Sequence, residues 1–226
     1  MQAKEIISSS ILPLKLKDSA DIALKIMQDL HVYNLPVVEK NKFLGLISEN
    51  DIMNMKKDKL FVKDLLKTSE DIYIFEDQHL FNIVDYFDKH SLSVLPVLSR
   101  SKKYIGSITS SKILFTLAKS SAVRNNGGII VLEMNEKDYS LSKISSITES
   151  NNINILSSYI TSFNESKNIE VTLKLNSHNL DRLLKDFERF NYHVSASFNK
   201  ENDLSNIEER YDSLMRYLNT WCPSEN

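Results

Sequence analysis

The stretch FLGLISENDI, residues 43–52, combines a short apolar strand pattern with the start of a helix. Apolar residues flank Gly45, and Ser48 opens the run Ser-Glu-Asn-Asp before the apolar Ile52. A hydroxyl residue where a strand passes into a helix is typical of an N-cap, which accepts a hydrogen bond from a free helix N–H. The same pattern returns at residues 104–113 as YIGSITSSKI. The two stretches predict one strand-to-helix unit that occurs twice.

The two copies differ at a position that decides their chemistry. Ser48 corresponds to Thr109, which keeps the hydroxyl, but Asp51 corresponds to Lys112. A carboxylate accepts hydrogen bonds, whereas a lysine ammonium only donates them. We therefore expect the two copies to share a backbone and to differ in the ligands they can hold.

The repeat extends on both sides of these stretches, with a period of about sixty residues. Residues 19–40 match residues 79–100. Each block begins with apolar residues at helical spacing and continues into a short apolar strand, LPVV in the first and LPVL in the second. The proline in each fits only the start or the edge of a strand. Each unit thus predicts strand, helix, strand, strand, helix. The first strands and the lead-in segments are expected at residues 11–16 and 71–75, and at 3–7 and 62–66.

Composition excludes several classes of protein. With 226 residues, 42% of them hydrophobic and 26% charged, the chain is globular and long enough for two domains. A net charge of −2, with basic residues dispersed among acidic ones, predicts no nucleic-acid partner. No apolar run could span a bilayer, no signal-peptide core is visible, and Cys222 is alone. We expect a cytoplasmic protein without membrane contact.

The second half of the chain has a different order of elements. VRNNGG, residues 123–128, looks like a domain boundary. The pattern beyond it predicts strand, helix, two strands joined by a hairpin, helix and strand, which is the ferredoxin-like βαββαβ order. These elements are expected at residues 129–134, 140–152, 153–163, 168–175, 179–192 and 193–198, and an amphipathic helix at 204–221.

GLISEND (45–51), GSITSSK (106–112) and the paired LPV strands resemble the CBS domain, and the tandem pair resembles a Bateman module over about residues 1–122. The fold class this implies is α+β: tandem CBS domains, then a ferredoxin-like ACT-type domain and a C-terminal helix. The ACT resemblance lies in the element order and in NNINILSS. The whole combination resembles the bacterial acetoin-utilisation accessory proteins. The expected domains are 1–60, 61–123, 128–200 and 203–221.

In the CBS family, this loop binds adenosine-type ligands such as AMP, ATP or S-adenosylmethionine. The resemblance implies that Asp51 accepts hydrogen bonds from the ribose hydroxyls and that Ser48 meets phosphate, while neighbouring strand residues flank the adenine. The alternative is that Ser48 and Asp51 only cap their helix. The candidate site residues are Ser48, Asp51, Thr109, Lys112, Ile11, Pro13, Tyr33, Asn34 and Leu35.

Two interpretations of the second copy remain open. In one, Lys112 faces a cleft shared with Asp51 and meets the phosphates of a ligand held there. In the other, Lys112 is a solvated lysine beside a degenerate site, and Tyr73 fills that site. The ACT-like half lacks the glycine turn with which the family approaches amino acids, since NEKDYSL occupies residues 135–141.

Signals of catalysis are weak. Ser-x-x-Lys occurs at residues 99–102 and 140–143, as chance allows in a chain rich in both residues, and the histidines have no metal-ligand spacing. We read His31 and His90 as structural residues near helix C-termini. We therefore expect a non-catalytic regulatory protein without a cofactor or metal, a homodimer that senses an adenosine ligand. The alternatives are a ligand-free dimerisation scaffold and an amino-acid sensor.

Overall fold

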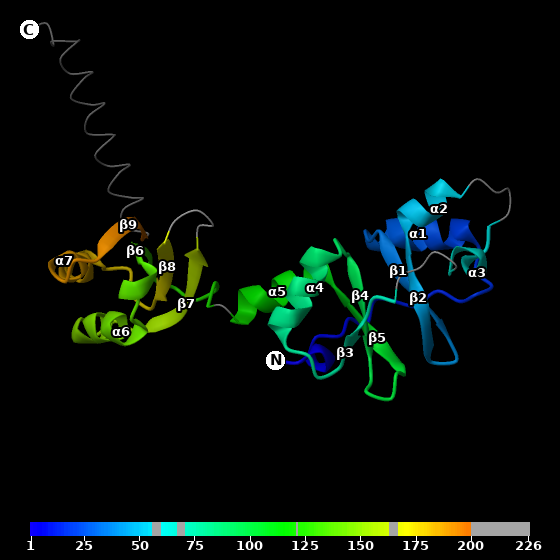
Figure 1. The fold of residues 1–226 in the computed structure, drawn as a ribbon, viewed down its shortest axis with the longest axis horizontal. Coiled ribbons are helices and arrows are strands. Elements are labelled where there is room, and N and C mark those ends of the chain that lie inside the picture. The colour runs from blue at the N-terminus through cyan, green and yellow to red at the C-terminus, as the bar shows by residue number, and fades with distance from the viewer. Residues whose placement is uncertain (56–59, 67–70, 121, 163–166, 200–226) are drawn as a thin grey trace, which may run out of the picture. The chain divides into compact units, whose positions relative to one another are not determined.

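The computed structural model describes residues 1–55, 60–66, 71–120, 122–162 and 167–199. The chain folds as two units, residues 1–117 and 118–226, each with its own core (Figure 1). The predicted helix at 204–221 lies outside the described residues.

The first unit contains the two predicted repeats. The first repeat consists of η1 (Ala3–Glu5), α1 (Ala20–Leu30), β1 (Asn34–Glu39), β2 (Lys42–Ser48) and α2 (Glu49–Asn54). The second consists of α3 (Val62–Leu65), β3 (Ile74–Phe75), α4 (Leu80–Lys89), β4 (Val94–Leu98), β5 (Tyr104–Thr109) and α5 (Ser110–Ser120). In each repeat two strands form an antiparallel hairpin with a register shift at the matching place, Val37/Val38 and Val97/Leu98.

The first predicted strand of each repeat is shorter than expected. Residues 11–16 contribute only a bridge between Leu14 and Val37, and β3 is two residues long. The prolines explain this limit. Pro36 and Pro96 lie third in β1 and β4 rather than at the strand start, and each turns its missing N–H towards the side where this first strand pairs. Pairing on that side therefore begins only beyond the proline.

The lead-in segment joins the two repeats. The Ala3 N–H donates to Gln78 O over 2.9 Å, and Ser8 pairs with Ser107, so this segment packs first on the second repeat. It passes over Gly106, where an added Cβ would lie 2.5 Å from Ile7 Cγ2 and where φ is +155°. Glycine at this position thus leaves room for the Ile7 side chain and adopts a φ that other residues rarely do. The segment then reaches the first repeat at Leu14.

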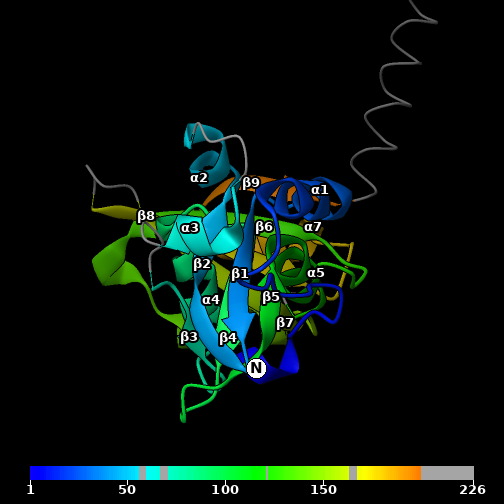
Figure 2. The same ribbon diagram turned by 90° about the vertical axis from the view of Figure 1, so that its right-hand side faces the viewer.

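A buried amide ties the repeats together where β1 of the first lies beside β4 of the second, two strands that Figure 2 labels. Asn34 is 2% exposed, and its Nδ2 donates to Val94 O over 2.6 Å. Its Oδ1 accepts from the Ser93 N–H, the Ser93 hydroxyl and the Val94 N–H. The Ser93 hydroxyl also accepts from the Tyr33 N–H over 2.9 Å. Because every polar atom of the amide is paired, the network fixes how β1 and β4 meet.

The second unit has the predicted order of elements. Its elements are β6 (Ile129–Asn135), η3 (Glu136–Asp138), α6 (Leu141–Ser150), β7 (Ile155–Ser162), β8 (Asn168–Leu175), α7 (Asp181–Arg189) and β9 (His193–Phe198). The sheet has the order β7-β8-β6-β9, with every neighbouring pair antiparallel, and α6 and α7 cover one face (Figure 1). This is the ferredoxin-like arrangement. The alternating burial of β8 supplies much of the core.

Candidate functional site

A pocket of about 510 Å³ lies at the strand-to-helix loop that contains Ser48 and Asp51. We call it the Asp51 pocket. The first repeat contributes the strand end and the helix start, and the second contributes the segment that follows α4. The lining residues are Tyr33, Asn34, Leu46, Ser48, Asn50, Asp51, Ile72, His90, Ser91 and Leu92.

The carboxylate of Asp51 takes part in a capping box. Its Oδ2 accepts from the Ser48 N–H and from the Ser48 hydroxyl, both over 2.7 Å. In return, the Asp51 N–H donates to Ser48 Oγ over 3.1 Å. The capping role that the sequence left open is therefore present. Within the described part of the chain, Oδ1 accepts no hydrogen bond, so half of the carboxylate's acceptor capacity remains for a ligand.

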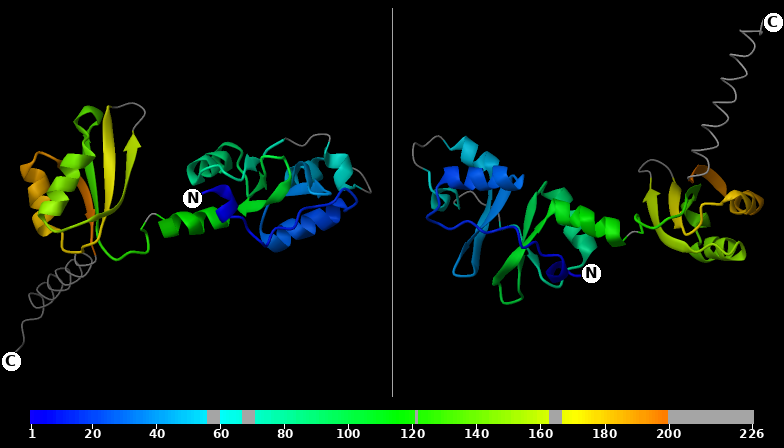
Figure 3. Two further views of the ribbon diagram at one scale, coloured as in Figure 1. Left: turned by 90° about the horizontal axis from the view of Figure 1, so that it is seen from below. Right: turned by 180° about the vertical axis from the view of Figure 1, so that it is seen from behind.

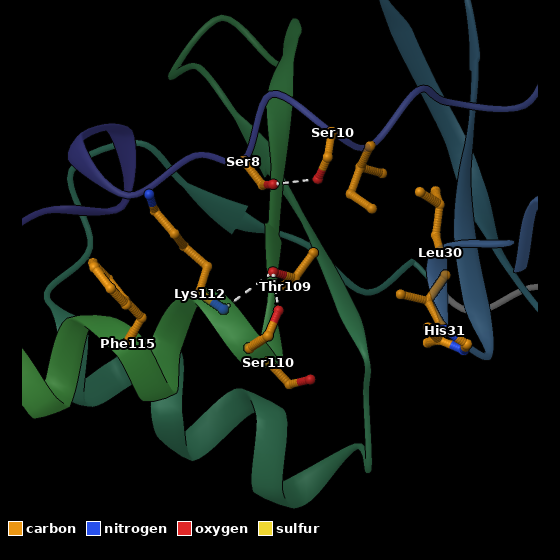
Figure 4. A pocket seen from close by; sticks show the side chains of 11 residues that line it. Ser8, Ser10, Leu30, His31, Thr109, Ser110, Lys112 and Phe115 are labelled. Carbon is orange, nitrogen blue, oxygen red and sulfur yellow. Dashed lines mark hydrogen bonds between the residues drawn. The ribbon is translucent and has the colours of Figure 1, made fainter.

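A second pocket, of about 600 Å³, lies at the corresponding loop of the second repeat. We call it the Lys112 pocket. Its lining residues are Ser8, Ser10, Ile11, Leu30, His31, Val32, Thr109, Ser110, Ser111, Lys112 and Phe115. Thr109 Oγ1 accepts from the Lys112 N–H over 3.2 Å, which places the lysine in the first turn of α5. Figure 4 shows the Lys112 side chain extending away from Leu30 and His31.

The two pockets are built alike, with the repeats exchanged. The Asp51 loop faces His90–Leu92 of the second repeat, and the Lys112 loop faces Leu30–Val32 of the first. His31 and Ser91, which are equivalent, both have left-handed backbones, with φ of 52° and 47°. The two pockets share no lining residue. The expectation that Asp51 and Lys112 face one shared cleft is therefore wrong.

The structure also corrects the placement of several candidate residues. Ile11 lies in the Lys112 pocket rather than beside Asp51, because the lead-in segment runs from the second repeat to the first. Pro13 lines neither pocket, and Leu35 is fully buried in the core of the first repeat. Tyr73 does not fill the second pocket. Its ring packs edge-on against Phe43 and Phe75, with centroids 5.9 and 5.6 Å apart.

The remaining candidates each line one of the two pockets. Tyr33, Asn34, Ser48 and Asp51 all line the Asp51 pocket, and Thr109 and Lys112 line the other. Many of the residues that the sequence missed come from the opposite repeat, at the ends of α1 and α4, and others, such as Asn50 and Ser111, lie beside the predicted loop residues. His31 and His90 do follow those helices as predicted, but each also lines a pocket. The sequence repeat could have indicated these residues. When two repeats are related by a pseudo-twofold axis, the loop of each one can lie against the helix end of the other.

The second unit has a pocket of about 920 Å³ beside residues 135–141. Carboxylates and lysines both line it, among them Glu133, Asp138 and Lys143. Burial, and then the nearby charge of Asp138, raise the pKa of Tyr192 in the same wall. The loop without glycine therefore still adjoins a cavity of ligand size.

The described residues contain neither a metal-binding cluster nor a membrane-spanning helix. No group of His, Cys, Asp and Glu side chains is arranged to hold a metal ion among residues 1–55, 60–66, 71–120, 122–162 and 167–199. Across the same ranges, no helix is both long and apolar enough to cross a membrane.

The two repeats of the first unit each match the model of a known protein family. The family model for the CBS domain matches residues 3–58 and again residues 62–119. Among curated proteins, the inosine-5′-monophosphate dehydrogenase of Korarchaeum cryptofilum is 23% identical over 127 residues. That match covers 56% of this chain and 26% of the enzyme. The chain thus spans about a quarter of the length of that relative.

Solved structures give similar matches to about half of the chain. A CBS domain pair/ACT domain protein from Thermotoga maritima is 17% identical, with a TM-score of 0.47. It covers 53% of this chain and 98% of its own. CBSX2, solved in complex with AMP, is 20% identical, with a TM-score of 0.45. It covers 52% of this chain and 96% of its own.

Proposed function

The chain belongs to the CBS domain family, and from this premise we propose that its first unit is a regulatory module that binds one adenosine ligand in the Asp51 pocket. The ligand classes are AMP, ATP and S-adenosylmethionine. The observation that carries the proposal is the Asp51 carboxylate, which is held rigidly by Ser48 through one oxygen while the other accepts nothing from the described residues.

The rest of the pocket suits the other parts of such a ligand. A ribose diol donates two hydrogen bonds, and bonds to a charged acceptor contribute about 1.5–3 kcal/mol each. Tyr33, 45% exposed, offers an aromatic face, and Ile72 and Leu92 offer apolar surface for an adenine ring. The hydroxyl of Ser48 and the amide of Asn50 add polar groups at the helix start.

A ligand in this pocket would bear on the contact between the repeats. Tyr33 and Asn34 line the pocket; Tyr33 bonds to Ser93 of the second repeat, and Asn34 bonds to both Ser93 and Val94. A ligand that packs on Tyr33 and bonds to Asp51 favours the arrangement in which these bonds are made. The regulatory output of the module is therefore a change in how firmly the two repeats are held together.

Calorimetric titration with AMP, ATP and S-adenosylmethionine tests the site. Asp51→Ala should weaken the best ligand by about 2–4 kcal/mol, because two charge-assisted hydrogen bonds are lost. Asp64→Ala is the matched control, since Asp64 also caps a helix start, by accepting from the Phe61 N–H, but lines neither pocket. Equal affinities for wild type and Asp51→Ala would place the ligand elsewhere.

The pocket of the second unit supports a second candidate, an amino-acid ligand bound by an ACT-type domain. Its wall carries both signs of charge, as a zwitterion requires, with Lys143 in the first turn of α6 and Glu133 on β6. A thermal-shift screen of free amino acids, repeated with Lys143→Ala, tests it. A shift that Lys143→Ala abolishes would favour this function, and no shift with any amino acid would exclude it.

Self-association is part of the same proposal. Exposed apolar side chains lie on the helices of both repeats, including the equivalent residues Met53 and Leu114, at 68% and 71% exposed. Such side chains favour burial against a second copy. We expect a homodimer, and light scattering that gave a stable monomer of 26.0 kDa at tens of micromolar would contradict it.

A further inference from the structure

The tips of the two hairpins lie together at one end of the first unit (Figures 1 and 3). Lys42 pairs with Lys103 in an antiparallel bridge, and the Tyr104 N–H donates to Asn41 O over 2.9 Å. The tips comprise residues 39–42 and 99–103. Together they present four lysines, which we call the basic hairpin surface: Lys40, Lys42, Lys102 and Lys103.

The lysines of this surface are placed at a cost to the fold. Lys42 and Lys103 stand directly opposite each other across the bridge, and like charges so placed destabilise a sheet. Lys40 and Lys102 have left-handed backbones, with φ of 46° and 59°, where glycine or asparagine is less strained. Several unfavourable residue choices that occur together at one place are expected at functional sites. A bound anion would offset the repulsion.

No acidic group of the described residues forms an ion pair with these four ammonium groups, all of which are exposed, although the β1–β2 register places Glu39 opposite Lys42. The neighbouring Arg100 is already engaged. Its guanidinium bonds to Asp77 over 2.6 Å, which lowers the pKa of that carboxyl, and it lies over the ring of Phe75. Glu39 is the one acidic residue within the two tips. The surface therefore carries a concentrated positive charge on a chain whose net charge is −2.

We propose that the basic hairpin surface docks an acidic segment of a partner protein. Residues 39–42 and 99–103 hold no aromatic or large apolar side chain, so they offer no platform for stacking bases and no anchor for a bilayer. Lysine ammonium groups on flexible stems suit a run of carboxylates, which needs charge without a fixed geometry. The acidic segment is thus favoured over a nucleic acid or a membrane.

The surface is separate from the candidate ligand site. Asn34 and Ser48, which line the Asp51 pocket, lie at the opposite end of the β1–β2 hairpin from Lys40 and Lys42. Partner and ligand can therefore bind at the same time. The proposal does not require a nucleotide in the Asp51 pocket, and its failure would leave the proposed function untouched.

Fluorescence anisotropy of a labelled decaglutamate peptide, titrated with the full chain near physiological salt, tests the proposal. Lys42→Glu/Lys103→Glu should weaken binding at least tenfold, because two attractions become repulsions, and added salt should weaken the wild-type complex. The matched control Lys25→Glu/Lys119→Glu makes the same charge change at two exposed helix positions and should stay within twofold. Equal loss in both variants would mean that only net charge matters and would overturn the proposal.

A second pair of variants separates binding from folding. Lys42→Gln/Lys103→Gln removes the repulsion, so the free energy of unfolding should stay equal or rise while peptide binding falls. A clear loss of stability would instead give these lysines a structural role. Tighter binding of wild type to single-stranded RNA or to phosphatidylserine vesicles than to the peptide, at the same salt, would also contradict the proposal.

Discussion

The Asp51 pocket and the Lys112 pocket have the same architecture and opposite chemistry. Each consists of a strand end and helix start from one repeat and a helix end from the other. In the first, Asp51 completes a capping box and adds a negative charge at a helix N-terminus, where the helix dipole favours it. In the second, Thr109 caps alone, and Lys112 places a positive charge where the dipole opposes it.

This difference shows that the repeated backbone and the charge that it carries at the pocket vary independently. The loop geometry requires a hydroxyl that caps the helix, and both repeats have one. The third residue after this hydroxyl, Asp51 in one repeat and Lys112 in the other, can vary, because the hydroxyl caps the helix with either residue present. Only the Asp51 pocket therefore retains a carboxylate at this position, the acceptor on which the proposed ribose contact depends.

The largest effect is expected from making the centre of the first repeat like that of the second. Asn34→Val introduces the residue found at the equivalent Val94 and leaves the Ser93 N–H, the Val94 N–H and the Val94 carbonyl without their partner. Each orphaned buried group costs about 1–3 kcal/mol, so we expect a loss of roughly 3 kcal/mol after partial relaxation.

Urea unfolding measures this loss. Ser93→Ala, which removes only the hydroxyl bonds to Tyr33 and Asn34, should cost less than half as much. If the two variants were equally stable, the amide would not be what joins the repeats.

A smaller effect should follow from giving the second pocket the residue of the first. Lys112→Asp places a carboxylate three residues after Thr109, where it can form the missing half of a capping box. It restores a ribose acceptor, so a weak second binding event for AMP should appear, at about 1.5–3 kcal/mol more favourable than in wild type. Titration that still showed a single event would mean that other residues also closed this pocket.

The smallest effect is expected from removing the charge of Lys112 without adding a carboxylate in its place. Lys112→Ala should raise the free energy of unfolding by about 0.3–1 kcal/mol, because a cation leaves the first turn of α5. Thermal unfolding at low salt measures this gain, and high salt should reduce it. A loss of stability would show that Lys112 forms a favourable contact in solution.

The repeat made much of the first unit predictable. Element order, the caps at Ser48 and Thr109, and the helices that end before His31 and His90 all follow from local patterns, and the structure agrees. The six elements of the second unit also lie near their predicted ranges. Membership of the CBS family follows from the same motifs. The narrower resemblance to acetoin-utilisation accessory proteins stays a prediction.

The composition of the pockets was less predictable, because it depends on contacts between the repeats. Nothing local to Ile11 indicates that its segment crosses from one repeat to the other, and nothing local to His90 places it beside Asp51. The basic hairpin surface could not be predicted from the sequence for the same reason. Its lysines form two close pairs about sixty residues apart in the sequence, and the bridge between Lys42 and Lys103 brings the pairs together.

Equilibrium dialysis of labelled AMP against the full chain tests the central claim, which is that the two pockets differ in their capacity to hold an adenosine ligand. We predict one AMP per chain in wild type, one in Lys112→Ala with affinity unchanged within about twofold, and none at matched concentrations in Asp51→Ala. Two AMP molecules per wild-type chain, or one that survives Asp51→Ala and is lost in Lys112→Ala, would contradict the account.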